Sequence, residues 1–215
     1  MSKGFLAVIA VVVLLFVGVF AFSGHKSNSN NKSSSSAGTP TNHVEGKGQS
    51  GVTLVEYGDY QCPFCEQYYP VTKQIAAEFN DQITFQFRNF PLINIHQNAF
   101  AGARAAEAAA AQGKFWQMHD LLYDNQSQWS DSSNPSQFFQ QYAQQLGLNL
   151  TQFNKDYSSN KVNNAINADM AAGNKLNIQG TPTFFLNGKQ IQTSASAASF
   201  EGQIKQAIAQ KQSQH

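Results

Sequence analysis

The sequence predicts an α/β domain in which a mixed β-sheet is built from a βαβ unit and then a ββα unit, with a helical segment inserted between the two. Three observations lead to this fold class. Residues 52–60 and 183–193 are rich in the β-branched and aromatic side chains that strands favour. Apolar residues after the first of these stretches recur three and four positions apart, as in an amphipathic helix. Several further helical patterns fill residues 93–176, the expected insertion, so the sheet domain should comprise residues 51–92 and 177–211.

The chain before this domain divides into three expected segments. Residues 1–4 form a short tail, and residues 5–22 form an unbroken apolar run. At about 1.5 Å of rise per residue, this run is just long enough to cross the hydrocarbon core of a membrane as one helix. We expect an uncleaved anchor, and a cleaved signal peptide is the alternative because Ala21 and Ser23 resemble a cleavage site. Residues 23–50 are rich in Ser, Asn and Gly, which predicts a flexible linker.

Charge and histidine content exclude some functions and leave others open. The chain has 14 Lys and Arg against 13 Asp and Glu, and no basic run alternates with aromatic residues. We therefore expect no nucleic-acid partner. His25 and His43 fall in the expected linker and should be solvated. His96 and His119 are expected to be structural residues, outside the catalytic set.

The first strand is expected over residues 52–60, where Glu56 interrupts a nearly continuous apolar run. A helix should follow at once, because Pro63 suits the first helical position, where its missing N–H needs no partner. Cys62 then lies at the cap of this helix. Alternating apolar and polar residues over 83–88 predict the next strand, and the order strand, helix, strand predicts a right-handed crossover between parallel strands.

The later elements are predicted in the same way. The insertion should hold helices at residues 97–111, 115–122, 135–146 and 151–172. Asn187-Gly188 is a strong signal for a type I′ hairpin turn between strands at 183–186 and 190–193. Apolar residues at helical spacing over 197–210 predict a last helix.

Cys62 and Cys65 are the only cysteines in the 215 residues, and two positions separate them. Such a pair can be an inert link, half of a zinc site or a redox-active dithiol. A structural zinc site needs four ligands, and no second cysteine pair or close histidine accompanies this one. An inert link would close a tiny loop and stabilise the fold little. We therefore predict a redox-active disulfide that uses no metal and no other cofactor.

The predicted helix gives the two thiols different roles. Cys62, at the helix N-terminus, faces unpaired N–H groups and the positive end of the helix dipole, which favour the thiolate. It is the expected nucleophile. Cys65 lies one turn further on and deeper, where it can attack a mixed disulfide formed at Cys62 and resolve it.

The motif Cys62-Pro63-Phe64-Cys65, followed downstream by Gly180-Thr181-Pro182-Thr183-Phe184, resembles the DsbA-like branch of the thioredoxin superfamily, and the similarity extends over residues 51–210. The resemblance implies a thioredoxin fold and a disulfide oxidoreductase of the bacterial cell envelope. It implies that Pro182 is a cis-proline facing the cysteines and that the backbone of Thr181 pairs with the substrate chain. Glu56 matches a buried acid that assists proton transfer to and from Cys65. Pro63 and Phe64, between the cysteines, complete the expected substrate-binding residues.

The expected function is the introduction of disulfides into reduced extracytoplasmic proteins by exchange through Cys62 and Cys65, with a membrane redox partner that reoxidises the pair. The catalytic domain should be held outside the membrane by residues 5–22, or be secreted or periplasmic after cleavage. Three alternatives remain open: an envelope reductase or isomerase, a copper-delivery module with His96 as a third ligand, and a redox-inactive binding domain that keeps the fold. Strongly oxidising members of the family carry His where this sequence has Phe64.

Overall fold

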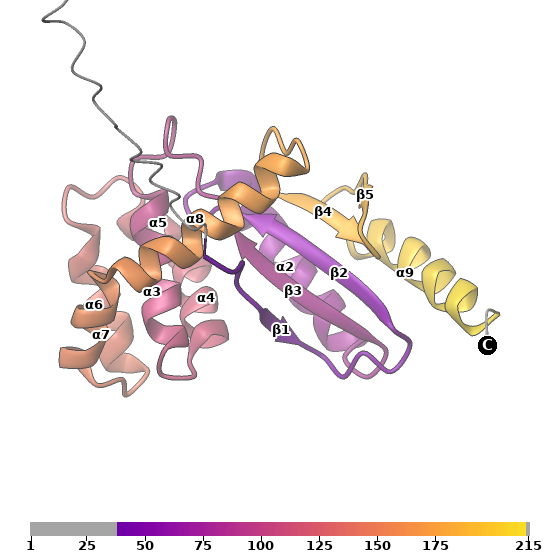
Figure 1. Ribbon diagram of the computed structural model, residues 1–215, viewed down its shortest axis with the longest axis horizontal. Coiled ribbons are helices and arrows are strands. Elements are labelled where there is room, and N and C mark those ends of the chain that lie inside the picture. The colour runs from indigo at the N-terminus through magenta and orange to yellow at the C-terminus, as the bar shows by residue number, and fades with distance from the viewer. Residues whose placement is uncertain (1–37, 214–215) are drawn as a thin grey trace, which may run out of the picture. The chain divides into compact units, whose positions relative to one another are not determined.

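The computed structural model describes residues 38–213, so the expected tail at 1–4 and the apolar run at 5–22 lie outside the described residues. Five strands of the described chain form one mixed sheet (Figure 1). Its spatial order is β1 (His43–Glu45), β3 (Ile83–Asn89), β2 (Val52–Gly58), β4 (Thr183–Leu186) and β5 (Lys189–Ile191). Strands β2 and β3 are parallel and strands β4 and β5 are antiparallel, as the predicted βαβ and ββα units require. The β1–β3 and β2–β4 pairs are antiparallel as well.

Helices α2 (Pro63–Glu78) and α9 (Ala197–Gln212) pack together and against the sheet. Their shared core includes Ile75 of α2, Phe184 of β4 and Phe200 of α9, all at most 2% exposed. The rings of Phe184 and Phe200 meet edge to face with their centroids 4.9 Å apart. This packing fixes the start of α2, where the cysteines lie, against the ends of the central strands.

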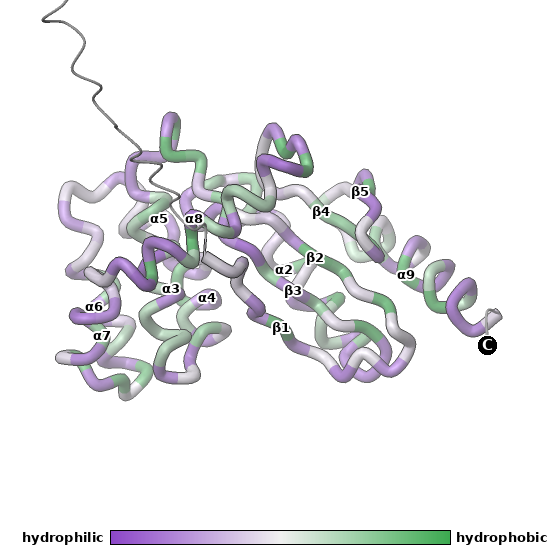
Figure 2. The backbone as a smooth tube through the Cα atoms, viewed as in Figure 1, coloured by the Kyte–Doolittle hydropathy of each residue, from purple (hydrophilic) through white to green (hydrophobic). Residues whose placement is uncertain are grey.

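The helices of the expected insertion lie together as a second group of elements beside the sheet (Figure 1). Its helices are α3 (Ala99–Ala110), α4 (Phe115–Asp124), α5 (Gln126–Trp129), α6 (Pro135–Gln145), α7 (Leu150–Tyr157) and α8 (Asn160–Lys175). Their apolar faces enclose Met118, Trp129, Phe139 and Phe153, each at most 1% exposed. Figure 2 shows green and purple stretches alternating along these helices, the pattern of one buried and one solvated face.

The expected flexible linker is wrong for its C-terminal part. Strand β1 pairs with β3, and upstream of it Thr41 donates through its N–H and its hydroxyl to the carboxylate of Asp169, at 2.8 and 2.6 Å. His43, expected to be solvated, bonds Glu107 at 2.7 Å and stacks on Phe115 with the ring centroids 3.6 Å apart. Composition did not reveal this order, because the partners of these polar residues lie 64 and 128 positions away.

The predicted hairpin between β4 and β5 is confirmed. Asn187 and Gly188 both have positive φ, 50° and 79°, the backbone shape that a type I′ turn requires. Within residues 38–213, no helix is both long and apolar enough to cross a membrane.

Candidate functional site

Cys62 caps α2, as the sequence predicts. It has extended φ and ψ of −71° and 123°, Pro63 occupies the first helical turn, and the Glu66 N–H donates to the Cys62 carbonyl at 3.1 Å. Both cysteines are free thiols, 3% and 0% exposed for Cys62 and Cys65. The structure therefore shows the reduced pair at the mouth of a helix.

The loop before β4 closes over Cys62. Its thiol donates to the carbonyl oxygen of Thr181 at 3.4 Å, across 119 positions of sequence, and the Thr181–Pro182 bond is cis. The Thr181 hydroxyl is buried and has no hydrogen-bond partner among the described residues. The structure thus brings the Cys62 motif and the Thr181-Pro182 segment together, as the family resemblance implies.

The environment separates the acidities of the two thiols. The pKa of Cys62 falls to about 6, first because the Cys65 thiol donates to it and then through the N–H groups of Cys65 and Phe64, which outweigh the effect of burial. Burial, followed by the hydrogen bond to Cys62 and the Cys62 charge, raises the pKa of Cys65 well above its ordinary value. At neutral pH, Cys62 is therefore mostly a thiolate and Cys65 remains protonated.

Glu56 lies on β2, 2% exposed, between Phe87 of β3 and Phe184 of β4 in the sheet register. Burial, and to a smaller extent the charge of Cys62, raises its pKa to about 8. In its ionised form, Glu56 in turn contributes to the raised pKa of Cys65. A carboxyl group that is neutral at pH 7 and is coupled to both thiols can supply or accept a proton during exchange.

Pro63 and Phe64 form the exposed rim of the site. The Phe64 side chain is 62% exposed, one of the most exposed large apolar side chains of the described residues. An exposed apolar ring next to a reactive sulfur suits contact with an unfolded polypeptide. The ring has no hydrogen-bond donor, so backbone N–H groups and Cys65 stabilise the Cys62 thiolate.

Sequence reasoning missed the side chains that hold the loop between β2 and Cys62. The Gln126 amide of α5 donates to the carbonyls of Tyr60 and Cys62 at 2.8 and 3.0 Å. Gln61 accepts from the Asn98 N–H at 2.6 Å, and Asp59 bonds His96 at 2.7 Å. In each of these contacts, one partner lies in the helical insertion or in the turn before it. No local sequence pattern therefore indicates these contacts.

His96 and His119, which the sequence places outside the catalytic set, both make hydrogen bonds within the fold. His119 is 4% exposed, and burial lowers its pKa to about 3, which leaves the ring neutral. Its Nδ1 lies 3.1 Å from the Tyr60 hydroxyl. His96, the third ligand that a copper site would need, bonds Asp59 through Nδ1. Among residues 38–213, no three His, Cys, Asp or Glu side chains gather in a way that could hold a metal ion.

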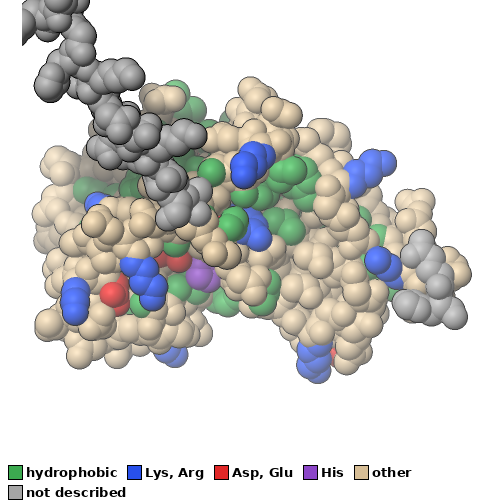
Figure 3. Space-filling view, in the orientation of Figure 1, with side chains coloured by type: hydrophobic (Ala, Val, Ile, Leu, Met, Phe, Trp, Pro, Cys, Tyr) green, Lys and Arg blue, Asp and Glu red, His purple; other side chains and the backbone are tan. Residues whose placement is uncertain are grey.

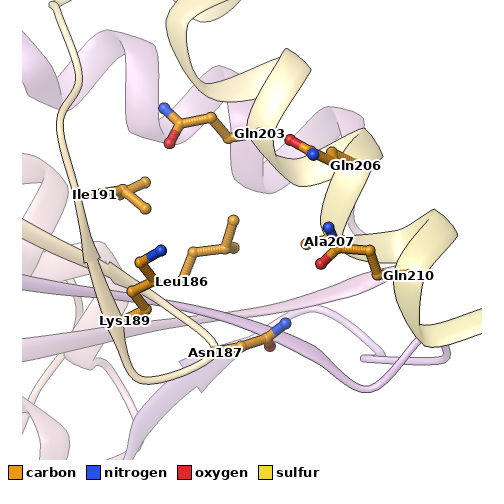
Figure 4. Close-up of a pocket in the computed structure, with 8 residues that line it drawn as sticks. All are labelled: Leu186, Asn187, Lys189, Ile191, Gln203, Gln206, Ala207 and Gln210. Atoms are coloured by element: carbon orange, nitrogen blue, oxygen red, sulfur yellow. The ribbon is translucent and has the colours of Figure 1, made fainter. Parts of the chain in front are cut away.

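A hollow in the described residues lies away from the cysteines. It has a volume of about 330 Å³ and separates the β4–β5 hairpin from α9. Figure 4 shows Leu186, Lys189 and Ile191 on the hairpin side, opposite the glutamine amides of α9. On the face drawn in Figure 3, the basic side chains are scattered and form no single patch.

The class of protein follows from comparison with known families. The family described as thioredoxin matches residues 38–206, and the chain belongs to it. The predicted fold class is confirmed by solved structures: alpha-DsbA1 from Wolbachia pipientis has a TM-score of 0.72 at 18% identity, covering 82% of this chain and 96% of that one. BdbD from Bacillus subtilis has a TM-score of 0.69 at 24% identity, covering 80% and 97%. Family and site together support a thiol-disulfide oxidoreductase of the thioredoxin type.

Two curated relatives carry a different description. The Na(+)/H(+) antiporter NhaA 1 of Mycolicibacterium gilvum is 38% identical over 161 residues, and NhaA 3 of Salinispora tropica is 37% identical over 148 residues. These alignments cover 73% and 69% of this chain, but 25% and 22% of the relatives. The chain therefore corresponds to about a quarter of the length of each.

The acidity of Cys62 can be measured directly. We expect the rate at which iodoacetamide alkylates the reduced protein to rise with pH around a midpoint of about 6, because the thiolate is the reacting form. The Cys65→Ala variant should have a midpoint shifted toward 9, since it loses the largest stabilising hydrogen bond. A wild-type midpoint near 9 would refute the assigned stabilisation.

Proposed function

We propose that the oxidised protein introduces disulfides into polypeptides. The observation that carries this proposal is the stabilised Cys62 thiolate, whose pKa is about 6. A dithiol whose reduced form is stabilised gives up its disulfide readily and is a strong oxidant. The cysteine environment therefore favours electron flow from substrate to this protein.

The reaction proceeds by two exchanges. A substrate thiolate attacks Cys62 Sγ of the Cys62–Cys65 disulfide, a substrate–Cys62 disulfide forms, and Cys65 leaves. Because Cys65 is a poor leaving group as a bare thiolate, the neutral carboxyl of Glu56 supplies the proton that it takes up.

A second substrate thiolate then attacks the substrate sulfur of the mixed disulfide and expels Cys62 as a thiolate. The substrate loses two electrons to the cysteine pair and gains one disulfide. In the mixed disulfide, the exposed Phe64 ring and the carbonyl of Thr181, which contacts Cys62 in the reduced form, lie where they can bind the substrate chain.

The compartment in which the enzyme acts follows from the chemistry of its disulfide. A stable disulfide needs an oxidising compartment, and the apolar run at residues 5–22 is long enough for one membrane crossing. We place the catalytic domain on the outer side of that membrane, where a membrane redox partner reoxidises Cys62 and Cys65.

Disulfide transfer to a reduced model protein tests the proposed direction. The oxidised protein is mixed with an equimolar amount of a reduced polypeptide that has two cysteines. The protein should become reduced as the polypeptide becomes oxidised. The redox state of both is measured by quenching the reaction and alkylating the free thiols. The Cys62→Ser variant should transfer nothing. If the oxidised protein stays oxidised while the reduced protein readily cleaves insulin disulfides, the reductase alternative replaces the oxidase.

Replacing Phe64 with histidine should make the pair more oxidising. An imidazole beside Cys62 adds a hydrogen-bond donor and, when protonated, a positive charge, both of which favour the thiolate. We expect the alkylation midpoint of Cys62 to fall below that of the wild type. The Phe64→Leu variant, which adds no donor, serves as the control and should retain the wild-type midpoint.

A further inference from the structure

Asp59 lies in the short connection between β2 and Cys62, and its peptide groups contact both halves of the dithiol. Its N–H donates to Cys65 Sγ at 3.5 Å, and its carbonyl accepts from the Cys62 N–H at 3.1 Å. Both cysteines are thiols here, so these hydrogen bonds belong to the reduced pair. The orientation of one residue therefore sets two hydrogen bonds of the reduced site.

The Asp59 side chain holds that residue in place. The carboxylate is 0% exposed and accepts three hydrogen bonds. Oδ1 accepts from the Gln61 N–H at 2.8 Å, and Oδ2 accepts from the Leu92 N–H at 2.9 Å and from His96 Nδ1 at 2.7 Å. Because a carboxylate only accepts, the Nδ1 atom of His96 carries the proton in this contact.

The partners of the carboxylate belong to a different part of the fold. Leu92 and His96 lie on the turn between β3 and α3, which the His96 N–H closes by donating to the Leu92 carbonyl at 2.9 Å. Asp59 thus joins the active-site loop to this turn, whose Ile95 side chain is 73% exposed. The Gln61 side chain, which accepts from the Asn98 N–H at 2.6 Å, is the other link from this loop to the segment before α3, so the Asp59 carboxylate is one of two anchors there.

We propose that Asp59, held by His96, is a positioning residue that keeps the Cys62–Cys65 couple oxidising. The Asp59 N–H stabilises the sulfur of Cys65 in the reduced pair, and a hydrogen bond to one form of a couple favours that form. Loosening Asp59 therefore destabilises the dithiol relative to the disulfide. The inference rests on the proposed function in one respect, namely that the pair cycles between the two forms.

The test measures the equilibrium in which the disulfide and two glutathione molecules yield the dithiol and glutathione disulfide. Asp59→Asn removes one acceptor and one negative charge. His96→Ala removes only the imidazole, and His96→Asn restores a side-chain N–H close to the position of Nδ1 without any charge. Asp169→Asn alters another buried carboxylate that bonds Thr41 and Arg88, away from the cysteines, and serves as the control.

Positioning predicts that the equilibrium constant for reduction falls about three- to tenfold in both Asp59→Asn and His96→Ala, the range expected for one hydrogen bond. His96→Asn and Asp169→Asn should stay near the wild type. A pure charge effect would instead raise the constant in Asp59→Asn and make His96→Asn behave like His96→Ala, and either result would overturn the inference. Unchanged constants in His96→Ala would do the same, even if Asp59→Asn does not fold. The wild-type constant itself tests the proposed function, so the two ideas can fail separately.

Discussion

Replacing Cys65 with serine is expected to turn the protein into a trap that holds partners through Cys62. Serine retains a donor for the Cys62 thiolate, whose largest stabilisation comes from the Cys65 side chain. It cannot resolve a mixed disulfide, because a hydroxyl does not displace a thiol in exchange. With glutathione disulfide or an oxidised polypeptide, a stable mixed disulfide should accumulate, detected by intact mass spectrometry and lost on reduction.

The Cys62→Ser variant provides a matched control, since it also retains one of the two cysteines. Its remaining thiol, Cys65, is 0% exposed, and its pKa is raised by burial. We expect its mixed disulfide to form slower by on the order of 100-fold at neutral pH, because both access and the thiolate fraction are lower. Equal trapping by the two variants would contradict the division of roles.

Replacing Glu56 with glutamine is expected to change the pH dependence of stability. The folded-state pKa of about 8 lies above the ordinary value of 4.5, so the folded protein holds a proton that the unfolded chain releases. The favourable contribution of Glu56 is therefore complete below pH 4.5 and is lost as pH rises through 8. The shift corresponds to a loss on the order of 5 kcal/mol across this window.

Cys62 acts in the opposite direction in the reduced protein. Its folded-state pKa is lowered from 9.0 to about 6, so its contribution is complete above pH 9 and is lost as pH falls through 6. Comparing wild type with Glu56→Gln at each pH removes the part of this contribution that does not depend on Glu56, so the difference between the two unfolding free energies reports Glu56 together with its coupling to Cys62.

Urea unfolding of the reduced proteins at pH 5 and pH 9 should show Glu56→Gln gaining stability relative to wild type as the pH rises. Replacing the exposed Glu78 with glutamine serves as the control for removing a surface carboxyl group. Parallel pH profiles for wild type and Glu56→Gln would show that the buried carboxyl is not protonated at neutral pH. Slower release of Cys65 in Glu56→Gln, followed in single-turnover disulfide transfer, would connect the same proton to the reaction.

The sequence was sufficient for the sheet, its central helix and the candidate site because those signals are local. Alternation along β3, the Asn187-Gly188 turn and the proline at the start of α2 each follow from the backbone preferences of neighbouring residues. The two-cysteine motif and the Thr181-Pro182 segment were linked through family resemblance, and the hydrogen bond between Cys62 and Thr181 then placed them together.

The unpredicted parts depend on contacts between distant positions. Residues Thr41 and His43 lie in a polar stretch that composition assigns to a linker, yet each has a buried acidic partner far along the chain. Asp59 lies 37 positions from His96, and nothing in its neighbourhood indicates that its carboxylate is buried. Such polar pairs carry no periodicity, so only the folded chain reveals them.

The reduction potential of the Cys62–Cys65 pair tests the central claim most directly. The full-length protein is equilibrated in glutathione buffers of increasing oxidising strength, the free thiols are alkylated, and the reduced fraction is read by mass spectrometry. A stabilised Cys62 thiolate predicts a potential clearly more oxidising than the about −270 mV of thioredoxin. A value at or below that of thioredoxin would contradict a disulfide donor and point to a reductase that uses the same two cysteines.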